Sequence, residues 1–179
     1  MADVKITDYT AQTAPASTDL IEIVRSAANY KMALGDLAKA FPFGLSFFWN
    51  NSVNPTASQT YYMAMNTDGL GASDNNYQKF VIPVTGVVVG MWIWIYIGGT
   101  TPSSGNVVCT LRINGSDTSI VVTKDWSTEG TDGAATGDTS HTAAVTAGQR
   151  ANIKVVTPAW STAPTGVRMG WALAINASA

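Results

Sequence analysis

The sequence predicts a mainly β protein: an antiparallel β-sandwich of the jelly-roll kind, preceded by a small N-terminal hairpin-plus-helix anchor. Eight short apolar or alternating segments follow one another through the body, and clusters of Gly, Pro, Asn, Asp and Ser separate them. A shift in composition marks the first 40 residues, which hold nine of the 22 charged side chains. We therefore divide the chain into an N-terminal segment, an aromatic linker and a jelly-roll domain, at 1–40, 41–55 and 56–179. The predicted strands are 59–65, 77–83, 87–97, 106–113, 119–124, 141–146, 150–156 and 167–175.

Charge is scarce, at 12% of residues with a formal net charge of −2. Surfaces that bind nucleic-acid phosphates or anionic membranes are basic, so neither partner is expected. The most apolar run, 84–97, is shorter than the roughly 20 residues of a transmembrane helix, and no membrane insertion is predicted. The first residues do not have the basic-then-apolar pattern of a secretory signal, so we expect synthesis in a cytoplasm.

The N-terminal segment reads as a hairpin followed by a helix. Residues 19–24, "DLIEIV", alternate like a strand, "YKMA" at 30–33 can pair back on it, and "LGDLAKAF" at 34–41 has helical spacing. Such a piece is too small to be stable alone and needs a partner surface. The linker, "FPFGLSFFWNNSVNP", would aggregate if exposed, so we expect it to pack on a neighbouring copy or on the body of the domain.

The segment 91–97, "MWIWIYI", is bulky and apolar on both faces of a strand, with isoleucines on one side and aromatic residues on the other. A two-layer sandwich buries only one of these faces. The second face therefore predicts a subunit interface, unless the N-terminal segment folds over it. The residues assigned to this interface are Trp92, Trp94 and Tyr96.

The sequence offers little chemistry. Asn114-Gly115, between two apolar runs, predicts a tight hairpin turn rather than a glycosylation site, and Cys109 in a strand-like run is expected in the core. His141 is the only histidine, so a Ser-His-Asp triad or a histidine metal site would need it, and we expect it to face solvent without a role. No catalytic residue, metal site or cofactor is predicted.

Two loops carry weaker candidates. The loop at 125–140 contains Asp125, Glu129, Asp132 and Asp138, which could offer oxygen ligands to Ca²⁺, although a solvated loop is the favoured interpretation. Trp126 in this loop and Trp160 in "TPAWSTAPTG" are predicted as distal-loop contacts, stacking on a sugar or anchoring in a protein partner. The alternative is that each covers an end of the sandwich.

Residues 3–40 resemble the N-terminal attachment segment of tailed-bacteriophage fibres and other virion appendage proteins. The matching elements are Lys5-Ile6, Asp19-Leu20-Ile21, and Lys31-Met32 through Asp36-Leu37. The resemblance implies that this segment docks on another virion protein. The residues that would make the contact are Leu20, Ile21, Ile23, Leu34 and Leu37.

The body is similar to trimeric jelly rolls of the C1q/TNF-like kind. The similarity lies in "TLRINGSDTSIVV", "AVTAGQRANIKV" and the final "VRMGWALAI", with Gln149 departing from the family's usual Gly-Asp pair. It implies a homotrimer whose strand faces meet at a threefold axis.

Together these observations predict a non-enzymatic virion protein: a homotrimeric fibre that attaches the particle to its host, with a host-surface saccharide as a candidate partner. The alternative is a head fibre or capsid decoration protein that binds no receptor. A depolymerase of host polysaccharide would need a carboxylate pair in a groove, for which the chain has few acidic residues outside its loops.

Overall fold

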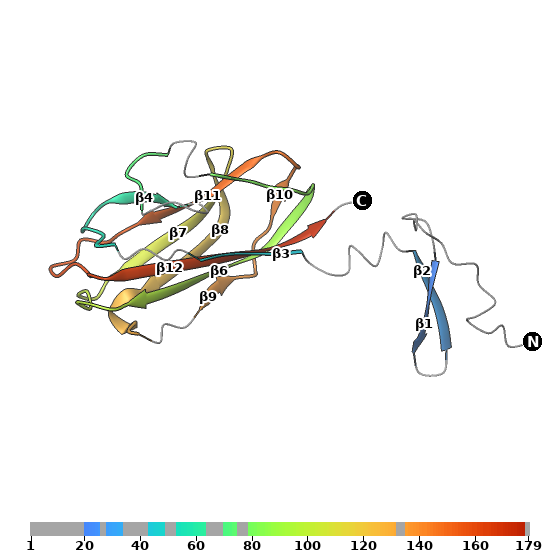
Figure 1. Ribbon diagram of the computed structural model, residues 1–179, viewed down its shortest axis with the longest axis horizontal. Coiled ribbons are helices and arrows are strands. Elements are labelled where there is room, and N and C mark those ends of the chain that lie inside the picture. Colours follow the sequence, from blue (N-terminus) through green and yellow to red (C-terminus); the bar gives the residue numbers. More distant parts are fainter. Residues whose placement is uncertain are drawn as a thin grey trace, which may run out of the picture. The chain divides into compact units, whose positions relative to one another are not determined.

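The protein is described by a computed structural model, which covers residues 20–25, 28–33, 43–48, 53–63, 70–74, 79–131 and 135–177. The chain divides into two compact units, Met1–Phe41 and Pro42–Ser178. In the first unit, β1 (Leu20–Arg25) and β2 (Ala28–Ala33) form an antiparallel hairpin (Figure 1). The predicted hairpin is confirmed, and the helix predicted at 34–41 lies outside the described residues.

The described residues of the second unit form two antiparallel sheets of five strands each (Figure 1). The first sheet has the order β10-β6-β12-β3, with β9 pairing beside β6. The second has the order β4-β11-β7-β8, with β5 pairing beside β11. The strands are β3 (Phe43–Phe48), β4 (Thr60–Met63), β5 (Phe80–Val81), β6 (Gly86–Ile97), β7 (Asn106–Ile113), β8 (Ser116–Asp125), β9 (Thr136–Asp138), β10 (Ala143–Val145), β11 (Arg150–Val156) and β12 (Val167–Ala177).

The strand order is that of a jelly roll. With the short β5 and β9 set aside, eight strands remain, and the first, β3, pairs with the last, β12. The second, β4, pairs with the seventh, β11, and the third, β6, pairs with both β10 and β12. This nested pairing of early strands with late ones produces a two-sheet jelly roll, so the predicted fold class is confirmed.

The structure differs from the sequence prediction at the first strand. Residues 43–48, placed in the linker, form β3 and pair with β12, so that Phe43 lies opposite Ile175 and Phe48 opposite Gly170. This part of the linker therefore lies on the body of the domain, one of the two predicted alternatives, but as a strand of the sheet. The sequence of residues 43–48 does not indicate a strand, because its aromatic residues follow no regular period. Of the predicted strand at 77–83, residues 77 and 78 lie outside the described residues, and Phe80–Val81 form the short strand β5.

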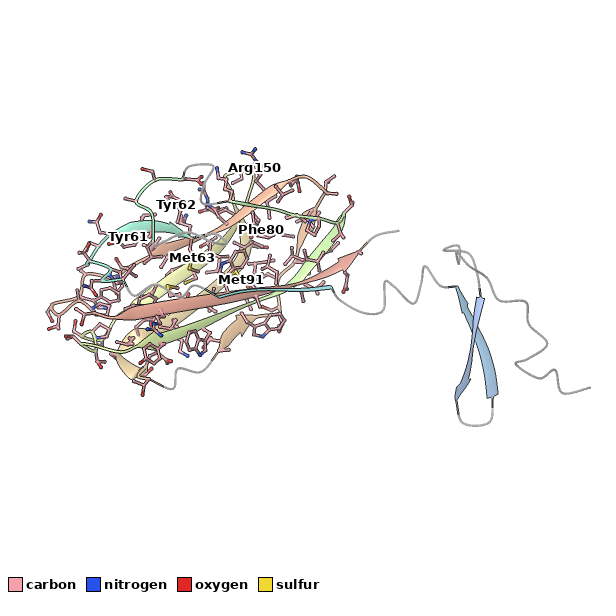
Figure 2. The ribbon with its side chains drawn as sticks, in the orientation of Figure 1. Tyr61, Tyr62, Met63, Phe80, Met91 and Arg150 are labelled. Atoms are coloured by element: carbon pink, nitrogen blue, oxygen red, sulfur yellow. The ribbon has the colours of Figure 1, made fainter. Side chains whose placement is uncertain are left out.

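The core lies between the two sheets. Met63 of β4 and Met91 of β6 point into it from opposite layers (Figure 2). Along β12 the buried residues alternate as predicted, from Val167 to Ile175. In β6 a β-bulge at Val89 interrupts the alternation, because Gly90 pairs with Ala174 but Val88 pairs with Ile175. Burying each of these side chains stabilises the fold by about 1.5–3 kcal/mol.

The predicted hairpin turn between β7 and β8 is confirmed. Asn114 and Gly115 have φ angles of 51° and 85°, the left-handed conformations of a two-residue turn. The Asn114 side-chain oxygen also accepts a 2.9 Å hydrogen bond from the backbone N–H of Arg150, which ties the turn to β11. No helix long and apolar enough to span a membrane occurs in the described part of the chain.

Candidate functional site

A row of aromatic side chains runs along the outer face of β6. Trp92, Trp94 and Tyr96, which we call the aromatic row, are half-buried, whereas the isoleucines between them are buried in the core. Trp94 and Tyr96 stack with their ring centroids 6.2 Å apart and their planes inclined by 25°. The row occupies the face predicted to be apolar, and no partner chain is needed to hold the rings in place.

Glycines beneath the rings explain how the aromatic row lies flat. A Cβ atom at Gly137, the β9 residue paired with Trp92, would stand 2.6 Å from the indole nitrogen. A Cβ atom at Gly90 would stand 2.6 Å from the far edge of the same indole, and one at Gly98 would stand 2.7 Å from the Tyr96 ring. The rings therefore rest against bare backbone and turn a broad surface outward.

The strand beside the aromatic row carries small residues. In the register of β12, Ala172 lies opposite Trp92 and Gly170 opposite Trp94, so a shallow strip borders the rings. Opposite Tyr96 lies Arg168, whose guanidinium is 5.5 Å from the centre of the Tyr96 ring, within range of a cation–π interaction. Arg168 is the one exposed charged residue in the described strands β6, β9, β10 and β12. This outer face is therefore apolar and nearly uncharged.

The prediction that Trp126 and Trp160 make distal contacts is wrong. Trp126 is fully buried and Trp160 is 6% exposed, and their ring centroids lie 5.7 Å apart. Trp126 begins the 3₁₀ turn η3 (Trp126–Thr128), which Asp125 caps by accepting a hydrogen bond from the Ser127 N–H at 2.9 Å. The turn directs Trp126 inward, where burial of the ring stabilises one end of the sandwich. This agrees with the alternative prediction, that each tryptophan covers an end of the sandwich.

Of the predicted docking residues, Leu20, Ile21 and Ile23 belong to β1, and Leu34 and Leu37 lie outside the described residues. Their role in docking stays a prediction.

A polar pocket lies where β9 leads into β10. Its volume is about 300 Å³, and it is lined by Val121, Gly137, Asp138, Thr139, Ser140 and His141. Asp138 is buried at the end of β9, whereas the His141 side chain is about half exposed. Because Gly137 also lies against Trp92, this pocket adjoins the aromatic row. The sequence analysis missed it, although the "DTSH" spacing, an Asp followed by Ser and His, is a signal for an Asp-centred turn.

The Asp138 carboxylate organises this loop. It accepts hydrogen bonds from the Ser140 hydroxyl at 2.9 Å, from the Ser140 N–H at 3.0 Å and from His141 Nδ1 at 2.9 Å. It also accepts the N–H of Val121 in β8 at 2.9 Å, which links the first sheet to the edge of the second. Burial opposes ionisation, but these hydrogen bonds outweigh it and hold the pKa of Asp138 well below its usual range.

The three residues do not form a catalytic triad. In a triad the carboxylate and the serine hydroxyl engage opposite nitrogens of the imidazole. Here Asp138 and Ser140 both approach Nδ1 of His141, at 2.9 and 3.2 Å, and the Ser140 hydroxyl is within hydrogen-bond distance of Asp138 as well. The arrangement provides no route for His141 to activate Ser140.

The carboxylates proposed as calcium ligands serve separate structural roles. Asp125 caps η3, Glu129 pairs with Lys124 at 2.9 Å, and Asp138 holds its own loop, while Asp132 lies outside the described residues. Within the described ranges, no group of three or more His, Cys, Asp or Glu side chains could hold a metal ion. The structure therefore does not support the calcium alternative.

A second polar cluster lies on the outer face of the second sheet. Arg112 of β7 pairs with Asp74 and, at 2.7 Å, with Asp117, and its guanidinium lies 5.2 Å from the centre of the Tyr62 ring. Asp74 also accepts a 2.9 Å hydrogen bond from Asn152. Burial raises the pKa of Asp74, but its hydrogen-bond partners lower the pKa by more than burial raises it. The pKa therefore lies below its ordinary value, and the carboxylate stays charged. These groups bind one another and fasten the segment 70–74 onto the sheet.

Comparisons with known proteins give a distant structural similarity and no family. No family model matches the chain, and no curated protein matches it. Among solved structures the chain is similar to a family 35 carbohydrate binding module from Clostridium thermocellum, at 11% sequence identity and a TM-score of 0.35, over 72% of this chain and 90% of that one.

Proposed function

We propose that this chain is a non-enzymatic attachment protein of a tailed-phage particle. In this proposal the jelly roll assembles as a homotrimer through the aromatic row, and residues 1–40 dock on another virion protein. The assembled heads face outward and contact the host. The virion assignment comes from the resemblance of residues 3–40, and the trimer comes from the resemblance of the body to trimeric jelly rolls together with the second apolar face of residues 91–97.

The outer face of the first sheet is the observation that carries the proposal. An apolar face with three flat aromatic rings and a single exposed charge, Arg168, is typical of an interaction surface. Closed symmetric association is the common way for copies of one chain to cover such a face. The small residues of β12 beside the rings leave room for a neighbour's side chains.

A binding role is also supported by how the acidic side chains are used. Asp74, Asp117, Asp125 and Asp138 each accept hydrogen bonds from groups of the chain itself. A glycosidase needs two carboxylates that are free to act on its substrate. These four carboxylates instead hold parts of the fold together.

The location of the protein on the particle tests the proposal. Gold-tagged antibody against the jelly-roll unit is applied to intact particles of the phage that encodes the chain, and the label is located by electron microscopy. Label at the tail tip or baseplate is the expected result. Label spread over the head would instead favour a capsid decoration protein, and unlabelled particles would overturn the virion assignment.

A further inference from the structure

We infer that the polar pocket of β9 and the following loop is a binding site for a neutral hexose unit of a saccharide, with Trp92 at its border. The inference rests on the proposed attachment function and supplies the class of ligand that the attachment would recognise. It assigns this contact to Ser140 and His141, in place of the buried Trp126 and Trp160.

The loop is fixed before any ligand arrives. Asp138 is 7% exposed, and its two carboxylate oxygens accept hydrogen bonds from Val121, Ser140 and His141. Ligand binding then costs little ordering of the loop, which is the advantage of a preorganised site. Because both oxygens of the Asp138 carboxylate already accept hydrogen bonds from the protein, they are not available as ligands for a cation.

Two neutral acceptors of the pocket, on His141 and Ser140, remain available to a ligand. A carboxylate only accepts hydrogen bonds, so Nδ1 of His141 must carry the proton that it shares with Asp138. In the neutral imidazole Nε2 is then an acceptor, on a side chain that is 54% exposed. The Ser140 hydroxyl donates to Asp138, and the N–H at Nδ1 of His141, 3.2 Å away, can engage only one of its two lone pairs, so the other is available to a ligand donor. The hydroxyl groups of a sugar can donate hydrogen bonds to both of these neutral acceptors.

Trp92 is the end of the aromatic row that borders the pocket, because Gly137 lines the pocket and lies beneath the nitrogen-bearing edge of the Trp92 indole. This edge serves the saccharide site, while Trp94 and Tyr96, farther along β6, form the centre of the proposed trimer interface. A hexose has an apolar C–H face and a rim of hydroxyls, and it requires this combination of aromatic surface and hydrogen-bonding groups. An anionic ligand is disfavoured because Asp138, which lines the pocket, is negatively charged.

The single histidine makes a direct test available. The full chain is labelled with ¹³C and ¹⁵N in histidine, and the imidazole signals, which belong to His141 alone, are followed while glucose, galactose, mannose and N-acetylglucosamine are added in turn. We expect the ¹⁵N shifts to report a proton on Nδ1, and one of the four sugars to shift the Nε2 signal saturably.

Variants separate this site from a nonspecific effect. Ser140→Ala and His141→Gln are expected to weaken binding of that sugar about tenfold, the usual effect of losing one hydrogen bond. Ser161→Ala, at an exposed position of another loop, should bind like the unmodified chain. If none of the four sugars moves the His141 signals, or if Nε2 carries the proton in place of Nδ1, the inference is wrong.

The outcome is independent of the trimer proposal. An assembled chain that ignores all four sugars would overturn the saccharide site and leave the assembly intact. A chain that binds a sugar but is monomeric in solution would overturn the trimer and leave the saccharide site intact.

Discussion

The indole of Trp92 lies across the α-carbon of Gly137, its partner on the adjacent strand β9. The contact connects the aromatic row with the polar pocket, because Trp92 belongs to the row and Gly137 lines the pocket. Glycine is required at 137 for steric reasons: a methyl group there would occupy the space of the indole.

Replacing Gly137 with alanine should displace Trp92. We expect Gly137→Ala to lower the free energy of unfolding by about 1–3 kcal/mol, the usual cost of forcing an extra methyl group into a packed contact. Tryptophan fluorescence should shift as the indole moves. Gly130→Ala is the matched control, because a Cβ atom at Gly130 meets nothing within 4 Å. Equal stability of the two variants in urea unfolding would contradict the described contact.

Trp126 provides a test of the corrected loop assignment. Because its ring is fully buried against Trp160, Trp126→Ala should cost about 3–5 kcal/mol of unfolding free energy. Val81→Ala, at a side chain that is 58% exposed, should change it little. A Trp126→Ala variant as stable as the unmodified chain would instead restore Trp126 as a surface contact.

Asp138 should make stability depend on pH in the acid range. Its pKa is lower in the folded chain than its ordinary value of 3.8, so its contribution to stability is fully present above that value. The contribution declines as the pH falls below 3.8 and is lost once the folded-state carboxylate is protonated. Asp138→Asn should therefore be less stable at neutral pH, with a smaller further loss between pH 5 and 2. Urea unfolding at neutral pH and between pH 5 and 2 measures the stability of the unmodified chain and of Asp138→Asn. If the stability of the two proteins fell in parallel as the pH was lowered, Asp138 would not be the source of the pH dependence.

Cys109 should be unreactive in the folded chain. Burial raises the pKa of its thiol to about 12, so almost no thiolate is present at neutral pH. A thiol reagent at pH 8 is expected to modify Cys109 only after urea is added. Rapid modification of the native protein would place the thiol at the surface, against its predicted and observed position in the core.

The sequence predicts the regular parts of this fold well and its irregular parts poorly. The alternation of Val167 to Ile175 and the Asn114-Gly115 turn have periods or residue preferences that hold locally, and both are confirmed. The bulge at Val89 and the strand at 43–48 depend on pairing with the distant β12, which no local pattern encodes. Tertiary pairing decides these positions.

The same distinction applies to the candidate sites. The outward direction of Trp94 follows from alternation in one strand and is correctly predicted. The burial of Trp126 depends on how η3 and the loop of Trp160 meet, and their sequences look like exposed loops. His141 is half exposed, as expected, but its hydrogen bond to Asp138 was not predicted, because that carboxylate is held in place by the N–H of Val121 on another sheet.

The oligomeric state of the full chain in solution tests the central claim most directly. Sedimentation equilibrium should give three times the monomer mass of 18.8 kDa for the unmodified chain. Trp94→Asp, which places a charge in the middle of the aromatic row, should be monomeric or insoluble, whereas Val81→Asp, at an exposed apolar residue of the other sheet, should remain trimeric. A soluble Trp94→Asp trimer, or an unmodified chain that sediments as a monomer, would contradict assembly through this face.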